Sequence, residues 1–395
     1  MGAMESKNSL RIIREQLGLQ LSDVADFASI SLPRLENFES GQIRPSRKQM
    51  ERLADTYGVP VYALYSDKLP PTSPLPVDFR KSDPRPAALS PKGLQVFFAS
   101  EKIAKFTKQL AKVVGYKPLD LAVSARKANS SNRRASELRA AFDEWFAKRS
   151  TSLKLSGSNE QQFMGALRLF FEIQGGVLQI NDAPPSDYLG FYTYKEEKFP
   201  TIFVNRSISS KKAQLFTLAH EYCHALMDLE GVSNPFNARN KIERNCNIFA
   251  AEFLAPIENF TRTVESLPAG VRRDAASLIE ATSRATLLSK HAAAIRLVET
   301  EYLVQQQLVT WRRIFTRNPK EEKEEEKLVS PRAGGGAPHA KRLSEIGQLP
   351  VYLACKAMEA KFIDSYDVEV GLGLSANLQE KAFSLVTKRF KAALS

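Results

Sequence analysis

Residues 215–231 read LFTLAHEYCHALMDLEG and place two of the chain's four histidines four residues apart. On an α-helix, residues i and i+4 lie one turn apart on one face, so His220 and His224 would present two imidazoles at a spacing that can hold one ion. Glu221 projects about a quarter-turn away and can hold a metal-bound water without being a ligand itself. The stretch therefore predicts a helix carrying the H-E-x-x-H motif of zinc peptidases, with two histidines that only fill the core as the alternative.

A third protein ligand is expected downstream, because catalytic zinc sites use three protein ligands and a water. Residues 241–256, KIERNCNIFAAEFLAP, predict another amphipathic helix that offers two candidates. Glu243 follows His224 by 19 residues, which is enough for a loop and a returning helix. It shares a helix face with Asn247, which can support the site, whereas Glu252 lies in an apolar run. We favour Glu243 as the ligand and Zn²⁺ as the cofactor, with Glu252 as the alternative.

Other residues near the motif have two interpretations each. Cys223 and Cys246 are interpreted as small buried hydrophobic residues, with an oxidisable thiol pair as the alternative. If the site cleaves a peptide bond, the negative charge that develops on the carbonyl oxygen needs a hydrogen-bond donor besides zinc. Three tyrosines that precede the motif are candidates, namely Tyr188, Tyr192 and Tyr194. The alternative for each is a structural role. His291 and His339 are assigned no site.

The N-terminal residues 8–67 read as five short helices joined by tight turns. Apolar residues recur at helical spacing and stop at glycines, among them Gly41 and Gly58, while Ser22 and Ser46 are predicted N-caps. Helix, helix, turn and helix within about 60 residues is typical of a helix-turn-helix domain.

Two stretches of this block, LSDVADFASISLPRLENFESGQIRPS and LADTYGVPVYAL, resemble the XRE (lambda-repressor-like) helix-turn-helix family. Glu36, Gly41 and Pro45 fall where that family has an E-x-G-x-x-P-like turn, although the Glu-to-Gly gap is longer here. The resemblance implies an all-α domain that binds DNA.

The side chains available for reading DNA lie at the start of the third predicted helix. Ser31, Arg34 and Asn37 could hydrogen-bond a base edge. However, acidic residues outnumber basic ones by nine to eight in residues 1–67, so this segment alone would neutralise few phosphates. A protein-docking or vestigial role is therefore the alternative to DNA binding.

The net charge of +12 is concentrated in one segment. In residues 68–150, 17 Lys and Arg stand against 7 Asp and Glu. This segment begins with a Pro-rich linker, 68–90, and continues as helices. Its basic surface could bind nucleic acid or an acidic partner, or it could be a solvated helical face.

The middle of the chain changes character. GGVLQIND, LGFYTYK and PTIFVNRS, within residues 172–207, predict a small, mostly antiparallel sheet. The motif helix follows it, with Ser209 or Ser210 as N-cap. Beyond residue 256 the chain reads as helical, with a flexible charged and Gly-rich linker at 317–342 and a helical C-terminal region at 343–395.

FTLAHEYCHALM followed by ERNCNIFAAEFLAP resembles the ImmA/IrrE family of metallopeptidases over roughly residues 78–302. Members have Met where this chain has Ala255, and many carry an XRE domain ahead of the peptidase. The resemblance implies that His220, His224 and Glu243 bind zinc and that Glu221 is the base. It also implies a narrow protein substrate, commonly a repressor or antitoxin-like regulator cleaved under stress or in mobile-element control.

These observations predict an α+β, mainly helical chain. A helix-turn-helix domain (8–67) precedes a zincin-like metallopeptidase domain (91–316). Without an apolar run of about 18 residues or an N-terminal signal core, we expect a cytoplasmic protein with no membrane contact. The expected partners are a transcription regulator as substrate, DNA, and a second copy in a homodimer. The alternatives are a DNA-binding regulator or antitoxin with a structural metal site, and a scaffold that binds nucleic acid through residues 68–150.

Overall fold

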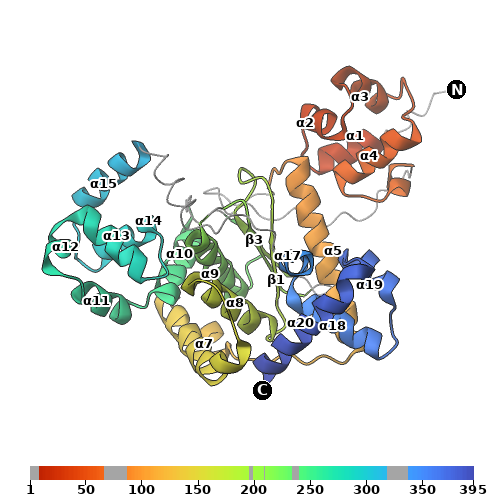
Figure 1. The fold of residues 1–395 in the computed structure, drawn as a ribbon. Coiled ribbons are helices and arrows are strands. Elements are labelled where there is room, and N and C mark those ends of the chain that lie inside the picture. Colours follow the sequence, from red (N-terminus) through yellow and green to blue (C-terminus); the bar gives the residue numbers. More distant parts are fainter. Residues whose placement is uncertain (1–8, 66–86, 195–198, 209, 234–239, 318–336) are drawn as a thin grey trace.

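The computed structural model is mainly helical, with one small sheet near its centre (Figure 1), as predicted. It describes residues 9–65, 87–194, 199–208, 210–233, 240–317 and 337–395. Most of the predicted linkers at 68–90 and 317–342 lie outside these residues. Within them, none of the helices combines the length and apolar character that crossing a bilayer requires.

The first helices form the predicted helix-turn-helix bundle. Their bounds are α1 Ser9–Gln16, α2 Leu21–Ala28, α3 Leu32–Glu39, α4 Arg47–Tyr57 and the 3-10 helix η1 Val61–Tyr65. Ser46 caps α4 as predicted, since its hydroxyl accepts from the Gln49 N–H at 3.4 Å. The predicted N-cap Ser22 is wrong. Helix α2 begins at Leu21 with Gln20 as its N-cap residue, two residues before the predicted cap, and the Ser22 hydroxyl donates to Asp23.

The helix-turn-helix bundle packs directly on the helix that follows it. Four helices lead to the sheet: α5 Pro91–Val113, α6 Val123–Lys127, α7 Ser131–Leu153 and α8 Asn159–Glu172. Helix α4 ends at Gly58, whose φ of +65° favours glycine, and a Cβ there would lie 2.5 Å from Cδ2 of Phe98 on α5. The glycine therefore lets α4 end against α5.

The sheet has four strands in the order β1-β3-β2-β4. Their bounds are β1 Val177–Asn181, β2 Gly190–Thr193, β3 Thr201–Asn205 and β4 Gly231–Ser233. Strand β2 runs antiparallel to β3 and β4, but β1 and β3 are parallel. The sheet is therefore mixed, with the antiparallel pairing predicted from sequence at two of its three interfaces.

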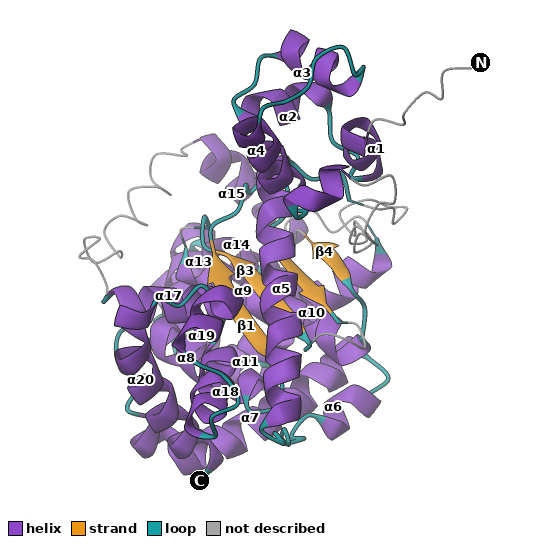
Figure 2. Ribbon diagram, turned by 90° about the vertical axis from the view of Figure 1, so that its right-hand side faces the viewer, coloured by secondary structure: helices purple, strands orange, loops and turns teal. Residues whose placement is uncertain are grey.

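The two faces of the sheet belong to different cores. On one face Phe191 and Phe203 stack at 4.7 Å between ring centroids, and Phe97 of α5 lies 5.1 Å from Phe191. These rings belong to the same buried cluster as the core of the helix-turn-helix bundle. The other face, which includes Tyr192 and Ile202, packs on the helices behind the sheet (Figure 2). The helix-turn-helix domain therefore shares a continuous core with the sheet.

The helices after the sheet include the one that carries the motif. Their bounds are α9 Lys211–Met227, α10 Lys241–Leu254, α11 Ile257–Glu265, α12 Ala269–Arg273, α13 Ala275–Ala285, α14 Lys290–Glu299 and α15 Gln305–Arg317. Helix α9 lies on β2 and β3, and α10 packs against α9 and α7.

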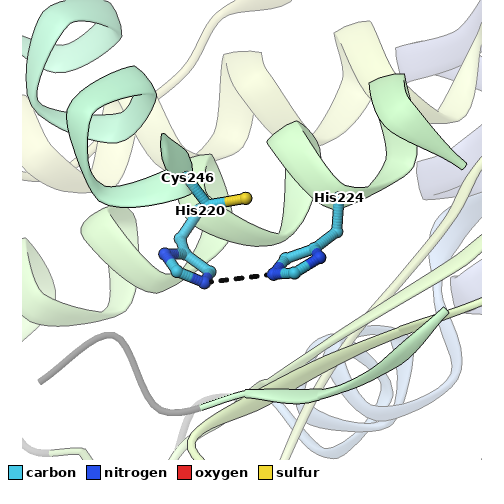
Figure 3. Close-up of side chains that lie close together, drawn as sticks. All are labelled: His220, His224 and Cys246. Carbon is cyan, nitrogen blue, oxygen red and sulfur yellow. Dashed lines mark hydrogen bonds between the residues drawn. The ribbon is translucent and has the colours of Figure 1, made fainter. Parts of the chain in front are cut away.

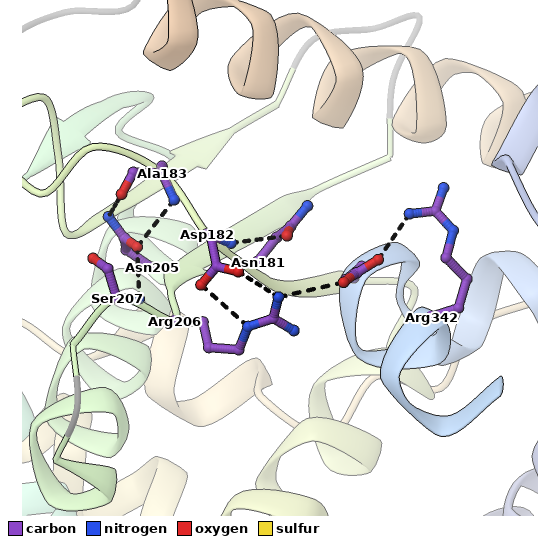
Figure 4. Close-up of polar contacts among 8 residues, drawn as sticks. Asn181, Asp182, Ala183, Asn205, Arg206, Ser207 and Arg342 are labelled. Carbon is purple, nitrogen blue, oxygen red and sulfur yellow. Dashed lines mark hydrogen bonds and ion pairs between the residues drawn. The ribbon is translucent and has the colours of Figure 1, made fainter. Parts of the chain in front are cut away.

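The C-terminal helices complete the main core. They are α17 Pro338–Ile346, α18 Gln348–Glu359, α19 Ser365–Leu372 and α20 Ala376–Leu394. Arg206, just after β3, joins α17 to the sheet by contacting Asp182 at 3.2 Å and Glu345 at 3.3 Å (Figure 4). Trp145 of α7 donates its indole N–H to the Ala393 carbonyl at 3.1 Å. Residues 343–393 are thus built into the same core as α7 and the sheet.

Candidate metal centre

The motif helix α9 places both histidines in the interior. Ser210, one of the two predicted N-caps, accepts from the Ala213 N–H at 3.3 Å. His220 and His224 are 0% and 1% exposed. Their Nε2 atoms lie 3.2 Å apart (Figure 3). The i, i+4 spacing therefore turns the two rings toward one point, as the sequence predicts.

Helix α10 brings a carboxylate to the same point. Asn240 caps it by accepting from the Glu243 N–H at 2.8 Å, which fixes the first turn. Glu243 Oε1 lies 3.1 Å from His224 Nε2, and Glu243 Oε2 lies 3.4 Å from His220 Nε2. The structure thus brings together the three predicted ligands.

The alternative ligand, Glu252, lies elsewhere. Its Oε2 forms a buried ion pair with Arg296 of α14. Its Oε1 accepts from the backbone N–H of Ile257 at 3.3 Å. Glu252 therefore ties α10 to the helices that follow.

Asn247, which is predicted to support the site, contacts His220. Its Oδ1 lies 2.9 Å from His220 Nδ1, so we assign the proton of the ring to Nδ1. That assignment directs the lone pair of Nε2 toward His224 and Glu243.

The donor set fits a small divalent cation. Zinc bound at about 2.0–2.2 Å by nitrogen and oxygen in a tetrahedron separates its ligand atoms by about 3.3–3.5 Å. The three separations of 3.1, 3.2 and 3.4 Å are close to that spacing. Glu243 Oε2 is also buried and accepts no hydrogen bond from the described residues, which suits an oxygen that faces a cation. The residues present therefore fit zinc.

Charge at the centre is strongly coupled. Burial lowers the pKa of His220, but the Glu243 carboxylate offsets this and leaves that pKa at about 9. Burial raises the pKa of Glu243, yet the two histidines bring it down to about 2. Before a cation binds, a proton shared in this ion pair balances the buried negative charge.

Glu221 is held by two residues that the sequence reasoning missed. Ser233, on the edge strand β4, donates its hydroxyl to Glu221 Oε1 in a short hydrogen bond. Gly190, at the start of β2, faces the same carboxylate, and a Cβ there would lie 2.5 Å from Oε1. Burial raises the pKa of Glu221 to about 8, which suits a group that exchanges protons near neutral pH.

The tyrosine candidates have other contacts. Tyr188 donates its hydroxyl to the Gly93 carbonyl at 2.8 Å, on the α5 side of the sheet. The Tyr192 hydroxyl lies 3.3 Å from Asp228 Oδ1. Tyr194 is 37% exposed. These contacts favour a structural role, the alternative stated above, for Tyr188 and Tyr192.

The predicted DNA-reading residues lie on or beside α3. Ser31 is its N-cap residue, Arg34 is exposed over the Phe38 ring at 5.8 Å, and Asn37 is half-buried. Charge averaged over residues 1–67 concealed a second feature. Three exposed basic side chains lie after α3. Arg44 lies between α3 and α4, and Arg47 and Lys48 begin α4.

Two segments of the chain match known families. Residues 171–276 match the M78 peptidase family model described as the IrrE N-terminal-like domain, and residues 8–63 match a helix-turn-helix domain. The chain therefore joins a helix-turn-helix domain to an IrrE-like domain of a metallopeptidase family, which confirms both resemblances.

Among curated proteins, the chain is similar to the HTH-type transcriptional regulator DdrOP3 of Deinococcus deserti. The two are 44% identical over 55 residues, which is 14% of this chain and 43% of that regulator. The chain thus spans less than half the length of this relative. No solved structure matches the chain.

Proposed function

We propose that the chain is a zinc-dependent endopeptidase fused to a DNA-binding helix-turn-helix domain. Its substrate would be a regulatory protein of the repressor or antitoxin type, cleaved in stress response or mobile-element control. The observation that carries the proposal is the convergence of His220, His224 and Glu243 within 3.4 Å, with Glu221 on the same helix as the histidines. The matched peptidase family supports it.

The chain's own residues divide the work. His220, His224 and Glu243 would hold zinc, with Asn247 fixing the ring of His220. Bound zinc supplies Lewis acidity, which lowers the pKa of a water and polarises a peptide carbonyl. Glu221 takes the proton of the attacking water and returns it to the leaving amine. Ser233 binds Oε1 of Glu221, which leaves the orientation of Oε2 defined for that transfer.

DNA binding is proposed for the exposed surface of α3 and the start of α4. Arg34 can reach a base edge from α3, and the exposed Arg44, Arg47 and Lys48 follow it in the chain, with Arg47 paired to Glu51 at 3.0 Å. The match to a helix-turn-helix domain and the similarity to a transcriptional regulator support this role. We place the protein's action in the cytoplasm, where its DNA lies, and a homodimer stays a prediction.

A second function remains in competition. A DNA-binding regulator or antitoxin could use the same metal for structure alone, and the similarity to a named transcriptional regulator favours this reading. Structural zinc sites are closed by four protein ligands, whereas catalytic ones keep one position open. The two functions therefore differ in whether Glu221 has chemical work to do.

Glu221→Gln tests the proposal, because the amide keeps the size of the side chain and cannot accept the proton. Zinc content of the purified full chain and cleavage products in cells are measured for this variant. The control is Glu258→Gln, at an exposed position of α11. We expect zinc retained and products lost in Glu221→Gln only. Products that persist with zinc bound would favour the regulator with a structural metal.

A further inference from the structure

Two of the three cysteines lie at the metal centre, and the proposed mechanism uses neither. Cys223 precedes His224 on α9, and Cys246 lies one turn after Glu243 on α10. Both are fully buried and neither forms a disulfide. Helices α9 and α10 pack against each other, so these thiols lie in the interface between the ligand-bearing helices.

Cys246 is the one that approaches the imidazoles. Its Sγ and one ring nitrogen each of His220 and His224 all lie within 4.8 Å of one another (Figure 3). Tetrahedral zinc with bonds of about 2.3 Å to sulfur and 2.0–2.1 Å to nitrogen separates sulfur from nitrogen by about 3.5 Å. The sulfur is therefore at most about 1.3 Å too far, and rotation about the Cα–Cβ bond moves it farther than that.

A second observation indicates that this point accepts a cation. Glu243 Oε2 and Glu221 Oε2 are both buried and accept no hydrogen bond from any described residue. Two carboxylate oxygens without donors, beside two imidazoles, are the surroundings that a divalent ion compensates. Cys246 thus lies beside ligand atoms of which one, Glu243 Oε2, is buried without a hydrogen-bond donor among the described residues.

We propose that Cys246 is a fourth protein ligand, so that His220, His224, Glu243 and Cys246 close the resting centre. When the metal ion binds, the S–H bond of Cys246 breaks, a metal–sulfur bond forms and the proton is released to solvent. A centre closed by four protein ligands has no position for water. Because the inference rests on the proposed peptidase function, Cys246 would have to leave before a peptide is cleaved. The resting enzyme is then latent, and the departure of Cys246 during turnover is what distinguishes it from the closed structural site of the competing function.

Cobalt tests the ligand directly, since a thiolate on Co²⁺ gives a near-ultraviolet charge-transfer band that nitrogen and oxygen ligands lack. The full chain is loaded with one equivalent of Co²⁺, and cobalt content is measured beside the spectrum. We expect the band in the wild type and in Cys223→Ala, and its loss in Cys246→Ala with cobalt still bound. Cys223→Ala is the matched control, because it removes an equally buried thiol from the same interface.

The outcomes separate this inference from the proposed function. Bound cobalt without the band in the wild type, or a band that survives in Cys246→Ala, overturns the fourth ligand and leaves the peptidase intact. A chain that binds no cobalt overturns both. In the activity arm, zinc-loaded Cys246→Ala should turn over faster than the wild type, because its open position needs no displacement. Thermal unfolding of the metal-free variants establishes that each is folded.

Discussion

Replacing Gly190 with alanine tests how β2 positions Glu221. The new Cβ would lie 2.5 Å from Glu221 Oε1 and 2.8 Å from Thr217 Cγ2. Since favourable van der Waals contacts between heavy atoms begin at about 3.5 Å, the Glu221 carboxylate must move by about 1 Å. Overpacking of this kind destabilises by about 1–3 kcal/mol. A displacement of about 1 Å in a reacting group lowers turnover on the order of 100-fold.

Both effects can be measured on one preparation. Zinc content, the midpoint of thermal unfolding and cleavage of a proteome-derived peptide library are recorded for Gly190→Ala and for Gly270→Ala. Gly270 is the control, since its Cβ would meet no atom within 4 Å. We expect zinc retained by both variants, with lower stability and turnover in Gly190→Ala alone. Wild-type stability and turnover in Gly190→Ala would refute the argument that β2 confines Glu221.

Arg296→Ala leaves the buried Glu252 without its ion-pair partner and should lower the free energy of unfolding by about 3–5 kcal/mol, while zinc content stays unchanged. Loss of zinc from the folded variant would show instead that this ion pair also positions α10 at the metal centre. Arg34→Ala should weaken binding to a cognate operator, at a stated salt concentration, by about 1–3 kcal/mol, and equal affinities would exclude Arg34 from base reading. Removing zinc with a chelator should lower the unfolding temperature, and zinc at about 100 times its dissociation constant should restore about 2.7 kcal/mol; no shift would argue against a folded-state metal site.

The grouping of His220, His224 and Glu243 could be predicted from sequence because its parts are local. One helical turn relates His220 to His224, and Glu243 lies on the next predicted helix, where it shares a face with Asn247. Ser233 and Gly190 escaped prediction because their contact with Glu221 depends on strand order. The edge position of β4 and its pairing with β2 are long-range facts that no local pattern contains. Gly190, at the start of a predicted strand, was the one available signal.

In the fold, too, local features could be predicted from sequence and long-range pairings could not. Capping residues and glycines predicted the short helices of residues 8–67, although the first turn of α2 begins one residue before its expected cap. The parallel pairing of β1 with β3 was not predictable, since three short apolar runs do not state which neighbours pair. The packing of the C-terminal helices on α5, α7 and β1 could also not be predicted from sequence. Their amphipathic pattern indicates that one face of each helix is buried, but it does not indicate which element covers that face.

The shared core between the helix-turn-helix bundle and the sheet has a consequence for reach. Phe97, Phe191 and Phe203 lie in one packed cluster with the interior of the N-terminal helices, so the two parts should turn as a single body. If the protein binds DNA through α3, its metal centre would then lie at a fixed angular position around the double helix. Target proteins bound nearby would be accessible at intervals of about one helical repeat, roughly 10 base pairs. Moving a target by half a repeat would carry it to the opposite side of the duplex.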